Sequence, residues 1–417
     1  MRTLAVYTLV LGLAALVPTS GTIQLFTAAW SIGALVLLAF SAQQVGRRLA
    51  LPAVVSWIAV GLLLGQGGIR AIRFEADDLL ALCLSGAAVW LGLQVGVSVT
   101  WPQERRGWRL PMVVLASSLG SLLSIATAIY LFGHLPLHQA LLFGAVGSLW
   151  GPIFGAVVWT TDEASLVGLL GCTSSGLLLS AIIAVLHNDG YLIADGHNFL
   201  LRLWISPVLG AAAAAVLVRL GFLQRRIAAL IGLGALLTLA AIAERTFGLF
   251  CLPLGIGAGL VVSQHQDSSR QLAHLLQETR ELSALVYLGL LAASADPIGS
   301  AWLRTPGLYE IVLIQMIVLL LARGIAPAVW YPLPIGEHFG PRSSWLLLPK
   351  GAITCDLVLG NRGLAALLPP EAGSLLAKLA WADLFIYGVL FATLAFLIER
   401  TTRESEPEPV SGEVIIS

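Results

Sequence analysis

Long apolar runs, separated by short connections that carry arginine, follow one another along almost the whole chain. Of the 417 residues, 58% are hydrophobic and 11% are charged, whereas an average soluble protein is about 25% charged. A helix needs about 20 apolar residues to cross a lipid bilayer. We therefore expect an all-α polytopic membrane protein.

The runs predict about 13 transmembrane helices, or 14 if a short first stretch is included. The expected spans lie near residues 23–42, 52–69, 79–99, 111–132, 138–159, 166–186, 199–219, 226–243, 247–263, 281–295, 308–329, 344–361 and 379–398. Residues 1–22 fit either a signal-like segment or a first short span, and both remain open. Residues 399–417 end in the acidic, proline-containing run ESEPEPVSGEVIIS, which predicts a disordered tail.

The basic residues predict how the chain is oriented. One set of connections, together with the two ends, carries 14 of them, and the opposite set carries seven. By the positive-inside rule the richer side is cytoplasmic, so we expect a multi-pass protein of the plasma (inner) membrane with a cytoplasmic C-terminus. On that side, residues 267–282 place Leu272, Leu275, Leu276 and Leu282 on one helical face, which predicts an amphipathic surface helix.

A lysine interrupts the apolar segment LLLPKGAITCDLVLG at residues 346–360. Lys350 is one of only two lysines in the chain, and Pro349 and Gly351 flank it. Charged groups at bilayer depth usually face a partner or a water-filled cavity, and proline with glycine can interrupt a helix there. The segment predicts either a broken transmembrane helix that carries a site cation, or a span that begins at Lys350 with its side chain reaching the interface.

A second span, residues 141–159, has four glycines around Pro152 in its middle. Proline removes a helical hydrogen bond and glycine lowers the cost of unwinding. We expect a break at Trp150, Gly151 and Pro152, with a kinked helix whose glycines pack against neighbours as the alternative.

The two interrupted segments occupy matching positions in the order of the spans. We divide the spans into two groups of six, over residues 23–186 and 226–398, with 199–219 as a linker helix between them. Each interrupted helix is then fifth in its group. An odd linker between two groups of six gives repeats of opposite topology, and inverted repeats with matching broken helices are typical of secondary transporters. We expect one transporter domain over residues 23–398.

Three segments resemble the cation:proton antiporter superfamily, the sodium/hydrogen exchanger-like proteins. They are RRLALPAVVSWIAVGLLLGQG at 47–67, GLFCLPLGIGAGLVVS at 248–263 and PKGAITCDLVLG at 349–360. The resemblance implies a helix-bundle core with two crossed, discontinuous helices, a dimerisation domain that makes a homodimer, and elevator-like alternating access.

The chain departs from that family where the ion should bind. The family carries an aspartate in the span after its first broken helix, and here the corresponding run is GCTSSG, with Thr173, Ser174 and Ser175. Trp150, Gly151 and Pro152 replace the usual Thr-Asp-Pro, and Lys350 occupies the position of the family's basic residue. Asp356 is the candidate substitute for the missing acid. Burial would raise the pKa of its carboxyl group and the nearby Lys350 would lower it, so the pair could titrate in a usable pH range. A structural ion pair, or a polar contact to a neighbouring helix, is the alternative.

These observations predict a secondary active transporter that exchanges a monovalent cation, Na⁺ or K⁺, for protons. Lys350 would balance charge, Asp356 would carry the exchangeable proton, and Thr173, Ser174 and Ser175 would supply neutral ligands. The rivals are an anion or organic-acid transporter on the same fold and a non-transporting membrane sensor or partner subunit. With no Walker motif, nucleophile constellation or metal-ligand cluster we expect no enzyme, cofactor or metal, and a net charge of zero suggests no nucleic-acid partner.

Overall fold

The computed structural model describes the chain over residues 24–48, 51–65, 68–69, 71–72, 79–99, 109–149, 162–192, 196–221, 226–265, 272, 274–276, 278–294, 307–319, 321, 357–358 and 363–382. Within these ranges every regular element is helical. The helices are α2 (Gln24–Arg48), α3 (Ala53–Leu64), α4 (Leu79–Val97), α5 (Arg109–Phe132), α6 (Leu137–Gly147), α8 (Asp162–Asn188), α9 (Gly196–Arg219), α10 (Arg226–Phe247), α11 (Cys251–Gln264), α13 (Arg280–Ser294), α15 (Leu308–Leu319), the 3₁₀-helix η4 (Leu364–Leu367) and α19 (Pro370–Ala382).

Glycine ends several of these helices. Gly190, Gly221 and Gly248 follow α8, α9 and α10, and their φ angles are 68°, 72° and 65°. This left-handed backbone is the usual C-terminal cap, and glycine adopts it without the steric cost that a Cβ would add. The glycines therefore let long apolar helices turn back within a few residues.

Apolar surface covers the outside of the bundle, as expected for an integral membrane protein. Three helical stretches of the described part are long and apolar enough to cross a bilayer: Val114–Phe132, Leu170–Asn188 and Gly196–Arg219. Their outward side chains include Phe132 and Val208, which are 68% and 65% exposed. Large apolar groups at such exposure suit lipid better than water.

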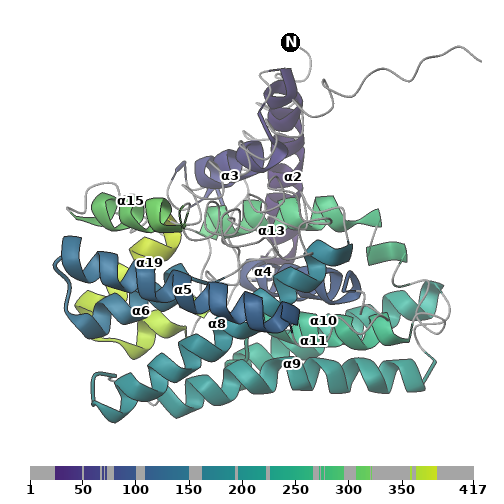
Figure 1. The fold of residues 1–417 in the computed structure, drawn as a ribbon. Coiled ribbons are helices and arrows are strands. Elements are labelled where there is room, and N and C mark those ends of the chain that lie inside the picture. Colours follow the sequence, from purple (N-terminus) through teal and green to yellow (C-terminus); the bar gives the residue numbers. More distant parts are fainter. Residues whose placement is uncertain are drawn as a thin grey trace, which may run out of the picture.

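The described helices pack as two bodies (Figure 1). The glycine-packed body comprises α2, α3, α4, α9, α10, α11 and α13, and the hydroxyl-lined body comprises α5, α6, α8, α15 and α19. Within each body the helices contact one another extensively, whereas the two bodies meet mainly where α8 touches α9 and α4. In Figure 1, α5, α6, α15 and α19 lie on the left and α4, α10 and α11 on the right.

Backbone-to-backbone contacts hold the first body together. Gly92 and Gly96 of α4 face Gly255 and Gly259 of α11, and a Cβ on any of these four glycines would meet backbone atoms of the opposite helix. In the same body Gly210 of α9 faces the Leu254 carbonyl of α11. Small residues allow membrane helices to approach closely and to gain van der Waals contact.

The same kind of contact recurs between α3 and α13. A Cβ on Gly61 would meet the Gly289 backbone, and one on Gly65 would meet the Ala293 backbone. Counted within the two groups of six spans, α3 and α11 are both second, and α4 and α13 are both third. Each of the α3–α13 and α11–α4 interfaces thus joins the second helix of one group to the third helix of the other, which is the pairing that twofold-related repeats produce.

Several helix ends differ from the predicted spans. Helix α2 continues through Arg47 and Arg48, six residues past the predicted end, and α19 begins at Pro370 rather than at residue 379. Both extensions are less apolar than the spans, so hydropathy alone does not detect them. The connection to α13 also differs from a single amphipathic helix, because Leu272 and Leu276 are buried whereas Leu282, which lies in α13, is 41% exposed.

Candidate functional site

Helix α6 ends inside the hydroxyl-lined body. It begins after Pro136 and ends at Gly147, so it has 11 residues and a length of about 16 Å, roughly half of the hydrocarbon thickness of a bilayer. Its last residues from Leu142 onward are buried, and so are Ser148 and Leu149 beyond its end. The C-terminal end of a helix carries a partial negative charge, and here that charge lies among buried side chains.

Ser175 of α8 meets this end of α6 directly. Its hydroxyl donates to the Ser148 carbonyl over 3.1 Å, and both residues are fully buried. The Ser148 hydroxyl in turn donates to the Ala145 carbonyl within the last turn of α6, at 2.9 Å. Both hydroxyls donate their protons to carbonyl groups at the α6 end, and the oxygen of Ser175 can still accept a hydrogen bond or coordinate a cation.

Ser174 connects α8 to α5 at the same level. Its hydroxyl donates to the Gly171 carbonyl at 3.0 Å and lies 2.9 Å from the hydroxyl of Ser118. The two hydroxyls share a hydrogen bond in which either oxygen can be the donor. Both side chains are buried, so α5 and α8 share a polar contact within an otherwise apolar interface.

Gln315 of α15 reaches α6 from the opposite side. Its side chain is fully buried, and its amide nitrogen lies 3.4 Å from the Phe143 carbonyl. A Cβ on Gly147 would lie 3.0 Å from the same nitrogen, so glycine at the end of α6 leaves room for the amide. Helices α5, α6, α8 and α15 thus contribute one cluster of neutral polar groups.

The structure separates the three hydroxyl residues predicted for the site. Ser174 and Ser175 enter the cluster, whereas Thr173 is exposed and donates to the Leu170 carbonyl of its own helix at 2.9 Å. Successive residues of a helix point about 100° apart, so three adjacent residues cannot all face one point. The other predicted site residues, Trp150, Gly151, Pro152, Lys350 and Asp356, lie outside the described residues.

Three members of the cluster were not among the predicted residues: Ser118, Ser148 and Gln315. A pattern in the sequence could have indicated two of them, because Ser118 is the eighth residue of the expected span 111–132 and Gln315 is the eighth residue of 308–329. These spans are both fourth in their groups. Polar residues at equal positions of corresponding spans are candidates for one shared site.

The cluster can coordinate a ligand through neutral oxygen atoms. Its described members are serine hydroxyls, one glutamine amide and helix-end carbonyls, and none of the named side chains is ionisable. Oxygen lone pairs and the negative end of α6 favour a positively charged ligand. Among the residues that the structure describes, no three His, Cys, Asp or Glu residues come together as a metal site would require.

The fold is that of a known class of transporter structure, although no protein-family model matches the chain. A solved structure of a sodium proton antiporter from Methanocaldococcus jannaschii matches 91% of this chain and 97% of its own, with a TM-score of 0.56 at 16% sequence identity. At that identity the likeness establishes the fold. It covers both the glycine-packed body and the hydroxyl-lined body.

Proposed function

We propose that this chain is a secondary active transporter that exchanges a monovalent cation, Na⁺ or K⁺, for protons by alternating access. The observation that carries the proposal is the end of α6 at Gly147, where a helix C-terminus and the buried hydroxyls of Ser174 and Ser175 come together. A broken helix that ends beside polar groups is the usual form of a transporter site. The shared fold with a sodium proton antiporter supports the same function.

The described cluster would supply part of the coordination shell of the cation. The hydroxyl of Ser175 donates to the Ser148 carbonyl, so its oxygen lone pairs can replace water around a small cation. Neutral ligands alone do not couple binding to protons, because serine and threonine do not titrate at physiological pH. Asp356 would therefore exchange the proton, and Lys350 would balance charge when the cation leaves.

Two further features of the proposal follow from the two bodies. Among the described helices the two bodies meet mainly through α8, which would allow the hydroxyl-lined body to shift against the glycine-packed body, as alternating access requires. The paired α3–α13 and α11–α4 interfaces support a division into repeats at 23–186 and 226–398, with α9 between them.

We place the protein in the plasma (inner) membrane as a homodimer with a cytoplasmic C-terminus.

Proton flux in proteoliposomes tests the proposal. Purified protein is reconstituted with a pH-sensitive dye, Na⁺, K⁺ and Li⁺ are added in turn, and wild type is compared with Asp356→Asn. We expect a cation-triggered pH change that the substitution abolishes. Glu371→Gln, which changes an exposed acid in the first turn of α19, is the matched control and should keep wild-type flux.

An anion or organic-acid carrier is the second candidate. It is favoured by the lack of a carboxylate among the described members of the cluster, together with Lys350 in the sequence. Flux that responds to anions but not to Na⁺ or K⁺, and that survives Asp356→Asn, would replace the cation proposal by this one. A folded protein with no flux of either kind would identify a sensor or partner subunit.

A further inference from the structure

Two histidines from different bodies meet where α8 ends and α9 begins. His187 lies in the last turn of α8, in the hydroxyl-lined body, and His197 lies in the first turn of α9, in the glycine-packed body. The centres of the two imidazole rings are 4.5 Å apart, and the ring planes are inclined by 69°. His187 is partly buried, whereas His197 and the neighbouring Asn188 and Asp189 are exposed. The imidazole pair is therefore open to solvent.

The packing of α8 against α9 holds the two rings together. Gly196, directly before His197, is buried, and a Cβ on it would lie 3.4 Å from the Cβ of His187. Glycine thus lets the first turn of α9 approach the last turn of α8. Two helical turns away from the pair, the Trp204 indole of α9 donates to the Ser180 hydroxyl of α8 over 3.1 Å. This hydrogen bond fixes the same two helices against each other.

Two imidazoles at this separation can share one metal ion. Imidazole nitrogen is a good ligand for Zn²⁺, Cu²⁺ and Ni²⁺, and its bond to zinc is about 2.0–2.1 Å long. With bonds of that length, two rings at neighbouring positions of one ion have centres about 4.5–5 Å apart. Rotation about χ2 of histidine is broad, so both rings can turn one nitrogen toward a common point.

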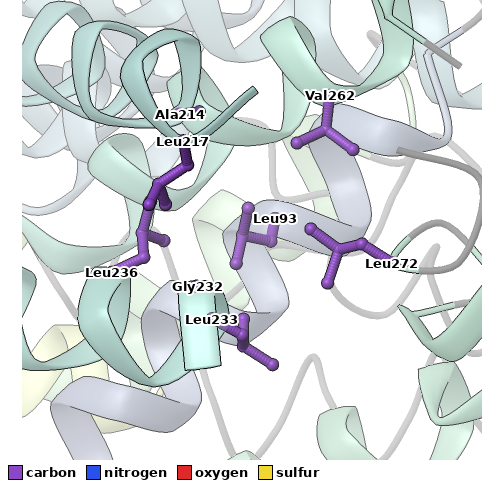
Figure 2. Close-up of a pocket in the computed structure, with 8 residues that line it drawn as sticks. All are labelled: Leu93, Ala214, Leu217, Gly232, Leu233, Leu236, Val262 and Leu272. Carbon is purple, nitrogen blue, oxygen red and sulfur yellow. The ribbon is translucent and has the colours of Figure 1, made fainter. Parts of the chain in front are cut away.

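The hollow inside the glycine-packed body offers no such ligands (Figure 2). Its walls are apolar throughout, and they include Leu93 of α4, Leu236 of α10 and Val262 of α11. An ion in this hollow would lose its water without gaining a partner. The imidazoles of the α8–α9 pair, in contrast, can replace water around a metal ion.

We propose that His187 and His197 form an exchangeable site for one divalent transition-metal ion, Zn²⁺, Cu²⁺ or Ni²⁺, that arrives from solvent. A structural zinc site has four protein ligands, and among the residues that the structure describes no third His, Cys, Asp or Glu completes such a site. Water therefore fills the remaining positions of the ion. The ion binds reversibly and is no resident part of the fold.

The bound ion would connect the two bodies. Helix α8 contacts α5 and α6 of the hydroxyl-lined body, whereas α9 contacts α11 of the glycine-packed body extensively. An ion held by both imidazoles fixes the angle between α8 and α9 at this junction. It would restrain the shift of one body against the other and slow transport, a consequence that rests on the proposed function, whereas the binding itself does not.

Equilibrium dialysis of the purified full chain tests the binding. The protein carries no polyhistidine tag, it is freed of metal with EDTA, and it is dialysed in detergent against Ni²⁺, Zn²⁺ or Mg²⁺. We expect one Ni²⁺ or one Zn²⁺ per chain and no Mg²⁺, because imidazole suits zinc and nickel whereas magnesium prefers oxygen ligands. No bound Ni²⁺ or Zn²⁺ would overturn the proposal.

Substitutions of single histidines locate the site. His187→Gln and His197→Gln should each weaken the binding of Ni²⁺ about tenfold or more, because one imidazole is lost. His274→Gln, which changes an exposed histidine beside Glu278, is the matched control and should keep wild-type affinity. Wild-type affinity in both variants of the pair, or an equal loss in the control, would overturn the site. Unfolding midpoints without metal establish that each variant is folded.

The consequence for transport is tested in proteoliposomes with and without Ni²⁺. The ion should slow the initial flux of wild type about fivefold, EDTA should restore it, and His197→Gln should be insensitive. Unchanged flux in wild type that has bound Ni²⁺ would overturn the restraint. If wild type shows no flux for any ion but Ni²⁺ still binds to the pair, the proposed function fails and the metal site stands.

Discussion

The two bodies solve the packing of membrane helices in different ways. In the glycine-packed body, backbones touch at Gly92, Gly96, Gly255 and Gly259, and side chains hardly separate them. In the hydroxyl-lined body, Ser118, Ser174 and Ser175 form hydrogen bonds between helices. Helix α6 of this body ends at Gly147, which gives it about half the length needed to cross a bilayer. Gly144 of α6 does approach α5 at Leu122 and Ala126, but the polar contacts are what distinguish this body.

The helix packing of the glycine-packed body is fixed, whereas the polar contacts of the hydroxyl-lined body are adjustable. Close backbone contacts exist at one helix register only, because a shift of a fraction of a turn brings a larger side chain into the interface. Hydroxyl groups can exchange one acceptor for another, or for water or a cation, at little cost. The contrast agrees with our proposal, in which the hydroxyl-lined body binds the cation and the glycine-packed body is the scaffold.

Gly92→Leu should cause the largest loss of stability. The new side chain meets the Leu252 carbonyl and the backbone around Ile256, neither of which can move without separating α4 from α11. We expect a destabilisation of about 3 kcal/mol or more, measured as a fall in the thermal unfolding midpoint in detergent. Gly86→Leu on the same helix is the control, because a Cβ there meets nothing within 4 Å. Equal shifts for both would refute the backbone-contact interpretation.

Ser175→Ala should have an intermediate effect. It removes the donor that lies 3.1 Å from the buried Ser148 carbonyl, and the loss of one buried hydrogen-bond partner costs about 1–3 kcal/mol. Thr173→Ala, two residues earlier on α8, removes an exposed hydrogen bond within the helix and should change stability by less than about 0.5 kcal/mol. Unfolding midpoints of the two variants compare them directly, and a larger loss in Thr173→Ala would contradict the buried cluster.

The contact between Ser118 and Ser174 should have the smallest effect of the three. A double-mutant cycle with Ser118→Ala, Ser174→Ala and the pair isolates the 2.9 Å hydrogen bond. We expect a coupling free energy of about 1 kcal/mol, the usual net value of one hydrogen bond. Strict additivity of the two single effects would mean that the two hydroxyls do not interact, and the hydrogen bond between Ser118 and Ser174 would have to be abandoned.

Much of the fold could be predicted because apolar runs of membrane length leave few alternatives. The expected spans 199–219 and 281–295 correspond to α9 and α13 within a few residues, since lipid forces the backbone to satisfy its own hydrogen bonds. Helix ends were harder to predict. Helix α19 begins at Pro370, nine residues before the expected span, in a stretch whose amphipathic pattern lowers its mean hydropathy.

The candidate site was only partly predictable. Ser174 and Ser175 were identified from the GCTSSG run, but Ser118 and Gln315 lie elsewhere in the chain. Their importance depends on how α5 packs against α6, α8 and α15 and on the contact between Gln315 and the Phe143 carbonyl. A single serine or glutamine in an apolar helix has many structural roles, so local sequence alone does not select it.

The sequence by itself determined that this chain is a helical membrane protein, because so many apolar residues with so few charges can be accommodated only in lipid. It also indicated where helices could break, because proline and glycine act on the backbone locally. Only the tertiary structure decided which residues matter at the contacts. Gly86 and Gly92 are alike in sequence, yet one faces open space and the other the backbone of α11, because contacts between distant segments arise only when the helices pack.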